Sequence, residues 1–132
     1  MLKWAPALLM MLTIFLFSAR PSINETHDLF DRLVNKGGHM IGYGLLAMSY
    51  WRVLGFNNNR RWLAWLFAVL YAVTDEYHQL FVAGRHGTAF DVLVFDNLGA
   101  LISLWLAGTF IKQKQPALQS LAVEQEALNA NS

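Results

Sequence analysis

The sequence contains no cysteine, only three prolines and few charged residues, and each shortage narrows the class of protein. Without cysteine, the chain forms neither disulfides nor thiolate metal sites. Charged residues make up 14% of the 132 residues, the formal net charge is +1, and the basic residues are dispersed. The sequence therefore lacks the basic patch that nucleic-acid binding requires, and we expect no nucleic-acid partner.

Apolar residues dominate the composition of the chain. They make up 55% of the chain, and the mean hydropathy is positive. Four apolar runs cover residues 4–19, 39–56, 62–82 and 90–111. A helix that crosses about 30 Å of hydrocarbon needs about 20 residues. We therefore predict an all-α membrane protein with a bundle of four transmembrane helices in residues 1–111. Residues 112–132 are expected to form a flexible cytoplasmic tail, with a short surface helix as the alternative.

The first apolar run could also be a secretory signal peptide, because Lys3 precedes a compact apolar stretch. Its end reads Phe17-Ser18-Ala19, which places a large residue where cleavage needs a small one. We therefore favour an uncleaved first span.

The distribution of basic residues predicts the orientation of the four spans. The side that holds both termini would carry Lys3, Arg52, Arg60, Arg61, Lys112 and Lys114, and the other side Arg20, Arg32, Lys36 and Arg85. Basic residues are enriched in cytoplasmic loops. The six-to-four distribution favours cytoplasmic termini in a multi-pass protein of a bacterial cytoplasmic membrane.

Polar residues interrupt the third and fourth runs. Asp75, Glu76, His78 and Gln79 lie near the end of the third run, and Asp91, Asp96 and Asn97 lie near the start of the fourth. A charge at the bilayer centre costs roughly 2.5–3.5 kcal/mol on insertion scales, so such residues usually face a protein interior and carry function. With the predicted orientation, all of them lie in the extracytoplasmic leaflet.

Helical spacing groups these residues on shared faces. Lys36, His39 and Tyr43 form one stripe at i, i+3 and i+7, and Asp75, His78 and Gln79 form another at i, i+3 and i+4. Small residues at spacings of four predict close helix contacts, and they are Gly38 with Gly42 and Gly99 with Ser103. The pattern predicts a tight bundle with a polar pocket that opens outward.

The ordered motifs resemble those of the VanZ-like family of small integral membrane proteins. They are Lys36-x-x-His39-x-x-x-Tyr43, Asp75-Glu76-x-x-Gln79, Arg85, Asp91 and Asp96-Asn97-Leu98-Gly99, and they cover residues 18–108. The family takes its name from a protein associated with resistance to teicoplanin-type glycopeptide antibiotics. The resemblance implies a membrane location and a link to the cell envelope.

The interval from Asp91 to Asp96 is one residue longer than the usual family pattern. Either Asp96 or Asn97 fills the family's polar position. A local bulge in the helix would absorb the extra residue.

These residues allow several kinds of chemistry. Candidate acid/base groups are Asp75, Glu76, His78 and Asp91, and candidate ligand-binding groups are Lys36, His39, Tyr43, Gln79, Arg85, Asp96 and Asn97. Paired carboxylates in a low dielectric suit general acid/base work. The alternative is structural, with Lys36 and Arg85 neutralising the carboxylates to lock the helices together. A metal site is disfavoured because no tighter ligand motif is present, and no cofactor is expected.

Two functional classes follow. We favour a binder or modulator of a cell-envelope component, with the bilayer and a lipid-linked precursor or anionic headgroup as partners. The alternative is a membrane-embedded enzyme acting on a lipid-linked phosphate, with Arg85 holding the anion. A proton path is weaker, because the polar residues do not continue across the membrane.

Overall fold

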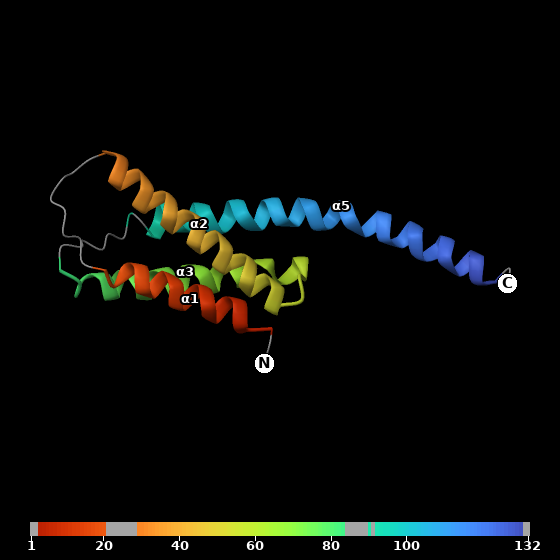
Figure 1. The fold of residues 1–132 in the computed structure, drawn as a ribbon, viewed down its shortest axis with the longest axis horizontal. Helices are drawn as coiled ribbons and strands as arrows, with labels where there is room; N and C mark the ends of the chain where they lie inside the picture. Colours follow the sequence, from red (N-terminus) through yellow and green to blue (C-terminus); the bar gives the residue numbers. More distant parts are fainter. Residues whose placement is uncertain (1–2, 21–28, 84–89, 91, 131–132) are drawn as a thin grey trace.

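A computed structural model describes residues 3–20, 29–83, 90 and 92–130 of the chain (Figure 1). Its elements are α1 (Ala5–Ser18), α2 (Leu29–Val53), the 3₁₀ turn η1 (Asn58–Arg60), α3 (Arg61–Gln79), the π-helical turn η2 (Val92–Asp96) and α5 (Asn97–Ala130). The described residues contain no strand, and their four long helices confirm the predicted all-α fold.

The helix limits follow local sequence signals. Pro6 lies in the first turn of α1, where a missing N–H costs nothing. After α2, Gly55 and Phe56 adopt positive φ angles of 71° and 54° and reverse the chain. The side chain of Asn57 then accepts a hydrogen bond from the backbone N–H of Asn59, at 2.9 Å. The α2–α3 connection is thus a short capped turn.

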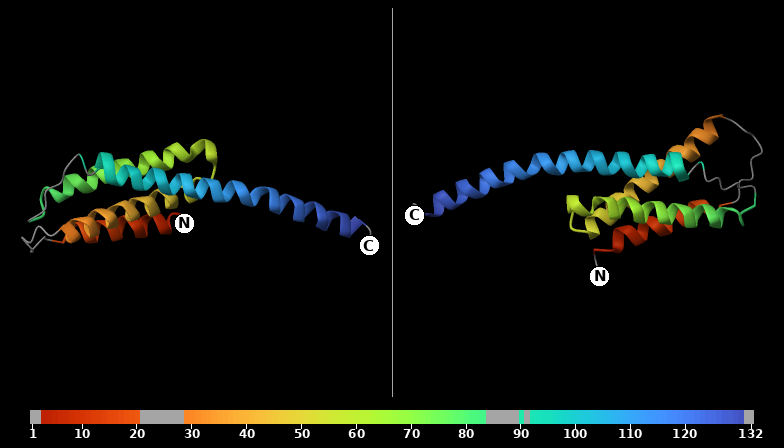
Figure 2. Two further views of the ribbon diagram at one scale, coloured as in Figure 1. Left: turned by 90° about the horizontal axis from the view of Figure 1, so that it is seen from above. Right: turned by 180° about the vertical axis from the view of Figure 1, so that it is seen from behind.

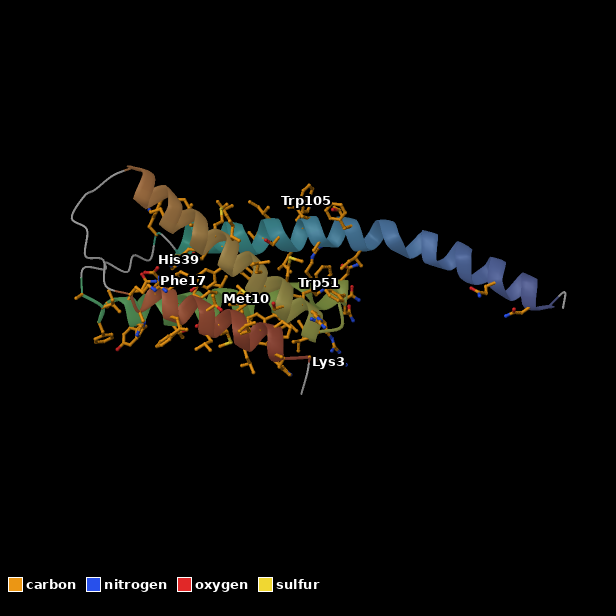
Figure 3. The ribbon with its side chains drawn as sticks, in the orientation of Figure 1. Lys3, Met10, Phe17, His39, Trp51 and Trp105 are labelled. Atoms are coloured by element: carbon orange, nitrogen blue, oxygen red, sulfur yellow. The ribbon has the colours of Figure 1, made fainter. Side chains whose placement is uncertain are left out.

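Helix α2 lies at the centre of the bundle. It packs against α1, α3 and α5, while α3 also contacts α1 and α5. Both chain termini leave at one end (Figures 1 and 2), so the chain crosses the bundle four times. We call this end, which carries Lys3, Arg52 and Arg60, the basic end. The opposite end, which carries Ser18, His39 and Gln79, is the polar end; Figure 3 labels His39 there and Lys3 at the basic end.

Small residues bring the helices together. Helix α3 buries one stripe along its length, formed by Ala64, Ala68, Ala72, Asp75 and Gln79. Because its first three members carry only a methyl group, neighbouring helices can approach closely there. The same stripe then becomes polar at Asp75, so the packing that forms the core also buries the candidate site.

The closest contact between helices joins α2 and α5. A Cβ atom on Gly99 would collide with the carbonyl group of Met40, and one on Gly44 with the hydroxyl of Ser103. The predicted contact at Gly99 and Ser103 is therefore confirmed. The prediction for Gly38 is wrong, since no atom of the described residues lies within 4 Å of a Cβ placed there.

Large apolar side chains cover much of the exterior of the bundle, among them Leu9 and Leu12 of α1 and Trp105 and Phe110 of α5. Within the described residues, one helical segment, Val94–Ile111, is long and apolar enough to cross a membrane. The apolar helix Ala5–Ser18 is shorter than a full span. Length and composition therefore support one membrane crossing, and the other three crossings remain part of the proposal below.

Two helices are longer than the apolar runs that predicted them. Helix α2 begins at Leu29, ten residues before the run. Helix α5 does not end at 111 but continues to Ala130 and projects beyond the bundle (Figure 1). Residues 112–130 are rich in Ala, Leu, Gln and Glu, which are good helix formers. The tail is thus helical through Ala130.

Candidate functional site

A buried carboxylate organises the polar end. The side chain of Asp75 on α3 is only 3% exposed. Its Oδ2 accepts hydrogen bonds from Ser18 Oγ on α1 at 2.6 Å, from Tyr43 Oη on α2 at 3.1 Å and from Gln79 Nε2 at 3.1 Å. Gln79 Nε2 also donates to Ser18 Oγ, at 3.3 Å. We call these four residues the carboxylate cluster; it joins three helices.

The hydrogen bonds of the carboxylate cluster are unevenly shared between the two oxygens of Asp75. All three donors reach Oδ2, whereas Oδ1 is buried and has no hydrogen-bond partner in the described part of the chain. A buried polar atom without a partner costs about 1–3 kcal/mol. The three hydrogen bonds to Oδ2 hold the carboxylate in place. Oδ1 stays available to accept a hydrogen bond from a further donor.

A second polar contact joins α2 to η2. His39 Nδ1 is 3.8 Å from Oδ1 of Asp96, which is 3% exposed, whereas the His39 side chain is 21% exposed. This is an ion-pair distance if the histidine is protonated, and it is too long for a direct hydrogen bond. A partly exposed imidazole thus faces a buried carboxylate.

Tyr43 links the two contacts. Its hydroxyl donates to Asp75, and its ring centroid is 6.0 Å from that of His39. The polar side chains therefore form a row that runs Asp75, Tyr43, His39 and Asp96, from α3 across α2 to η2. Figure 3 shows His39 at the end of the bundle where α1 also ends.

Lys36 completes the stripe predicted on α2. Its Nζ atom lies 4.6 Å from the ring centroid of Phe95 in η2, a cation–π distance. Lys36 and His39 both meet η2, whereas Tyr43 meets α3. The predicted grouping of these three residues along one side of α2 is therefore confirmed.

The π-helical turn accommodates the extra residue between Asp91 and Asp96. The predicted bulge is confirmed, because Val92–Asp96 forms a π-helix immediately before α5. With that turn in place, Asp96 faces His39. Asn97 instead accepts a hydrogen bond from Trp65 Nε1 at 2.6 Å, which ties α5 to α3. Asp96 thus joins the polar row, and Asn97 holds two helices together.

His78 lies apart from the polar row. Its ring stacks on Phe15 of α1 with a centroid distance of 4.5 Å. Its buried Nδ1 has no hydrogen-bond partner among the residues that the structure describes. The predicted grouping of Asp75 with Gln79 is confirmed by their hydrogen bond, but His78 turns to α1. Glu76, the residue after Asp75, is partly buried.

Two predicted residues, Arg85 and Asp91, lie outside the described residues. Sequence reasoning missed two residues, Ser18, which takes part in the carboxylate cluster, and Trp65, which bonds Asn97. Ser18 could have been found as a lone polar residue at the end of an apolar run. Among the described residues, no group of three or more His, Cys, Asp or Glu side chains could hold a metal ion.

Comparison with known proteins finds one family. A family model described as VanZ/LLP1 matches residues 3–113. The match includes the carboxylate cluster, the His39–Asp96 contact and η2, and it confirms the resemblance predicted from the motifs. Comparisons with curated proteins and with solved structures give no match.

Proposed function

The chain belongs to the VanZ/LLP1 family, and on this premise we propose that it is a multi-pass membrane protein whose polar end binds a cell-envelope component. The observation that carries the proposal is the convergence of polar side chains from α1, α2, α3 and η2 at one end of an otherwise apolar bundle. Ionisable residues inside a membrane are costly and usually mark a functional pathway or site.

The charge distribution supports an outward-facing polar end. Lys3, Arg52, Arg60 and Arg61 lie at the basic end. The described residues there, 3–10 and 50–67, include no acidic residue. Because short cytoplasmic segments carry an excess of Lys and Arg, the basic end would face the cytoplasm. The polar end would then face the side where the envelope is built.

The chemistry of the polar row indicates what it would recognise. Asp75 Oδ1 can accept a hydrogen bond from a hydroxyl, amide or amine of the ligand. Lys36 supplies a positive charge on the same side of α2, suited to a phosphate or carboxylate. A lipid-linked envelope precursor combines an anionic group with sugar hydroxyls and amides, so it is the class of ligand that this row would suit.

The test is binding of a purified lipid-linked precursor, with a polyisoprenyl phosphate carrying an N-acetyl sugar as the probe, to the detergent-solubilised chain. Native mass spectrometry would show a bound complex for the wild type. Asp75→Asn, with the same shape but no charge, should lose it. Thr109→Val is the matched control, because the Thr109 hydroxyl donates to Leu106 O in its own helix and lies away from the polar row. Equal binding by all three proteins would refute the proposal.

One observation favours a second candidate, a membrane-embedded enzyme. A partly exposed His39 that faces the buried Asp96 resembles a general base held in place by a carboxylate. If the protein hydrolyses the same probe, His39→Gln should abolish release of the phosphate or sugar while binding persists. His78→Gln is the control, since that ring lies against Phe15 of α1 and apart from the polar row. Binding without any turnover would reject the enzyme.

Glycopeptide resistance, which the family name suggests, stays a proposal as well. If the polar end acts on an envelope precursor, expression of the wild-type chain in a sensitive bacterium should raise the inhibitory concentration of teicoplanin. Expression of Asp75→Asn should leave that concentration unchanged.

A further inference from the structure

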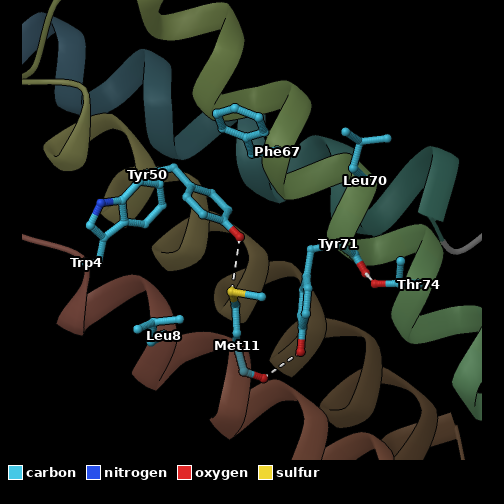
Figure 4. A pocket seen from close by; sticks show the side chains of 8 residues that line it. All are labelled: Trp4, Leu8, Met11, Tyr50, Phe67, Leu70, Tyr71 and Thr74. Carbon is cyan, nitrogen blue, oxygen red and sulfur yellow. Dashed lines mark hydrogen bonds between the residues drawn. The ribbon is translucent and has the colours of Figure 1, made fainter.

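A groove runs along the outside of the bundle between α1 and α3. Its volume is about 580 Å³, and Figure 4 shows its lining, which is Trp4, Leu8, Met11, Tyr50, Phe67, Leu70, Tyr71 and Thr74. Residues of α1 and α3 form its two walls, and Tyr50 of α2 lies between them. The groove does not include the carboxylate cluster, so it is a separate feature of the surface.

The groove offers its occupant hydrocarbon contacts. Each of its three hydroxyl groups already donates within the protein. Tyr50 Oη donates to Met11 Sδ at 3.2 Å, Tyr71 Oη to Met11 O at 2.6 Å, and Thr74 Oγ1 to Tyr71 O at 2.7 Å. Apart from the indole N–H of Trp4, the lining therefore leaves no side-chain donor for a headgroup or for unpaired backbone groups of a loop, whereas an alkyl chain needs none.

The groove is short enough to lie within one leaflet of a bilayer. Along α1 the groove extends from Trp4 to Met11, and along α3 from Phe67 to Thr74. Seven residues of helix rise about 10 Å, and one leaflet offers about 15 Å of hydrocarbon, half of the roughly 30 Å core. The walls stand open, since Leu8 and Leu70 are 58% and 53% exposed. One lipid chain can therefore enter from the side.

The mouth of the groove is basic. Lys3, which is exposed, precedes Trp4 at the start of α1. Arg60, also exposed, is the last residue of η1 and directly precedes α3, so it lies where the second wall of the groove begins. The described residues around the groove, 3–11 and 58–74, include no acid. Basic side chains beside a membrane surface attract anionic lipids, by about 1 kcal/mol each.

We propose that the groove binds a phospholipid of the leaflet at the basic end. Its acyl chain would lie between α1 and α3, and its anionic headgroup would meet Lys3 and Arg60. This inference rests on the membrane placement proposed above and is independent of any ligand at the polar end. Charge complementarity at the mouth favours this occupant over a second copy of the chain, whose corresponding mouth is basic too.

The test is lipid retention by the detergent-purified protein, measured by native mass spectrometry with phosphatidylglycerol and with phosphatidylcholine as probes. The wild type should retain phosphatidylglycerol in preference to phosphatidylcholine. Leu8→Trp fills the groove and should remove the bound lipid. Leu9→Trp is the matched control, because Leu9 is as exposed, at 64%, but does not line the groove.

The headgroup contact is tested by charge. Lys3→Gln combined with Arg60→Gln should weaken phosphatidylglycerol binding about thirtyfold, as expected for two lost contacts. Lys114→Gln, in the part of α5 that projects beyond the bundle (Figure 1), should leave binding unchanged.

Three outcomes would overturn the inference. They are equal loss of lipid in Leu8→Trp and Leu9→Trp, equal binding of the two phospholipids, and ready disulfide dimerisation of Leu8→Cys, which would assign the groove to a second copy. Asp75→Asn separates this inference from the function of the polar end, since that variant should retain phosphatidylglycerol fully even if it loses the envelope precursor.

Discussion

The two ends of the bundle use their polar residues in opposite ways. At the polar end two carboxylates are turned inward, since Asp75 and Asp96 are each 3% exposed and meet side chains of other helices. At the basic end Lys3, Arg52 and Arg60 are exposed on the surface. Exposed basic residues suit a membrane interface, whereas buried carboxylates are costly unless they are bonded. In the proposed function, the polar end therefore holds the binding site and the basic end sets the orientation.

The largest effect is expected from a substitution that disrupts the packing of the bundle, on which both ends depend. Gly99→Val places a side chain against the carbonyl group of Met40, where α2 and α5 meet. Since two backbones would have to separate, we expect a loss of about 3 kcal/mol or more of unfolding free energy and little folded protein. Thermal unfolding in detergent measures this.

Gly38→Ala is the control for that change. It also adds a methyl group to a helical glycine, but the new Cβ meets nothing within 4 Å. Since alanine is a better helix former than glycine by about 1 kcal/mol, Gly38→Ala should be at least as stable as the wild type. Equal destabilisation by both changes would contradict the assigned α2–α5 contact.

A smaller effect is expected from removing a serine hydroxyl at the polar end, and a serine nearer the basic end serves as its control. Ser18→Ala removes the shortest hydrogen bond to Asp75, at 2.6 Å, and a partner of Gln79. Because these groups stay buried, the cost should be about 1–3 kcal/mol of unfolding free energy. Ser49→Ala removes only a hydrogen bond to Leu45 O in the same helix. We expect Ser49→Ala to change stability by less than about 0.5 kcal/mol.

If Ser49→Ala destabilised the protein as much as Ser18→Ala, the carboxylate cluster would have no special part in joining α1, α2 and α3. Denaturant or heat unfolding of both variants, followed by tryptophan fluorescence, makes the comparison. The five tryptophans of the chain supply the signal.

The sequence predicted well those features that depend on residues close together along the chain. The apolar runs located the helices, the i, i+3, i+4 spacings located the shared polar faces, and the excess residue before Asp96 indicated the bulge that appears as η2. The start of α2 was missed because residues 29–35 include charged side chains, so a search for apolar runs passes over them.

Contacts between distant residues were harder to predict. Which glycine of α2 meets α5 depends on how the two helices are rotated and crossed, and Gly44 rather than Gly38 faces α5. The spacing of Asp75, His78 and Gln79 placed them on one face, yet the stacking of His78 on Phe15 depends on where α1 lies. Ser18 was missed for the same reason, since its partner is 57 residues away.

The central claim is that the polar end faces the outside of the cytoplasmic membrane and the basic end faces the cytoplasm. Since the chain has no cysteine, single cysteines report position without background. Ala83→Cys lies just beyond α3 at the polar end, and Asn58→Cys lies in η1 at the basic end; both sites are exposed. In right-side-out membrane vesicles a membrane-impermeant maleimide should label Ala83→Cys at once and Asn58→Cys only after permeabilisation. The reverse order, or equal labelling of both before permeabilisation, would contradict the account.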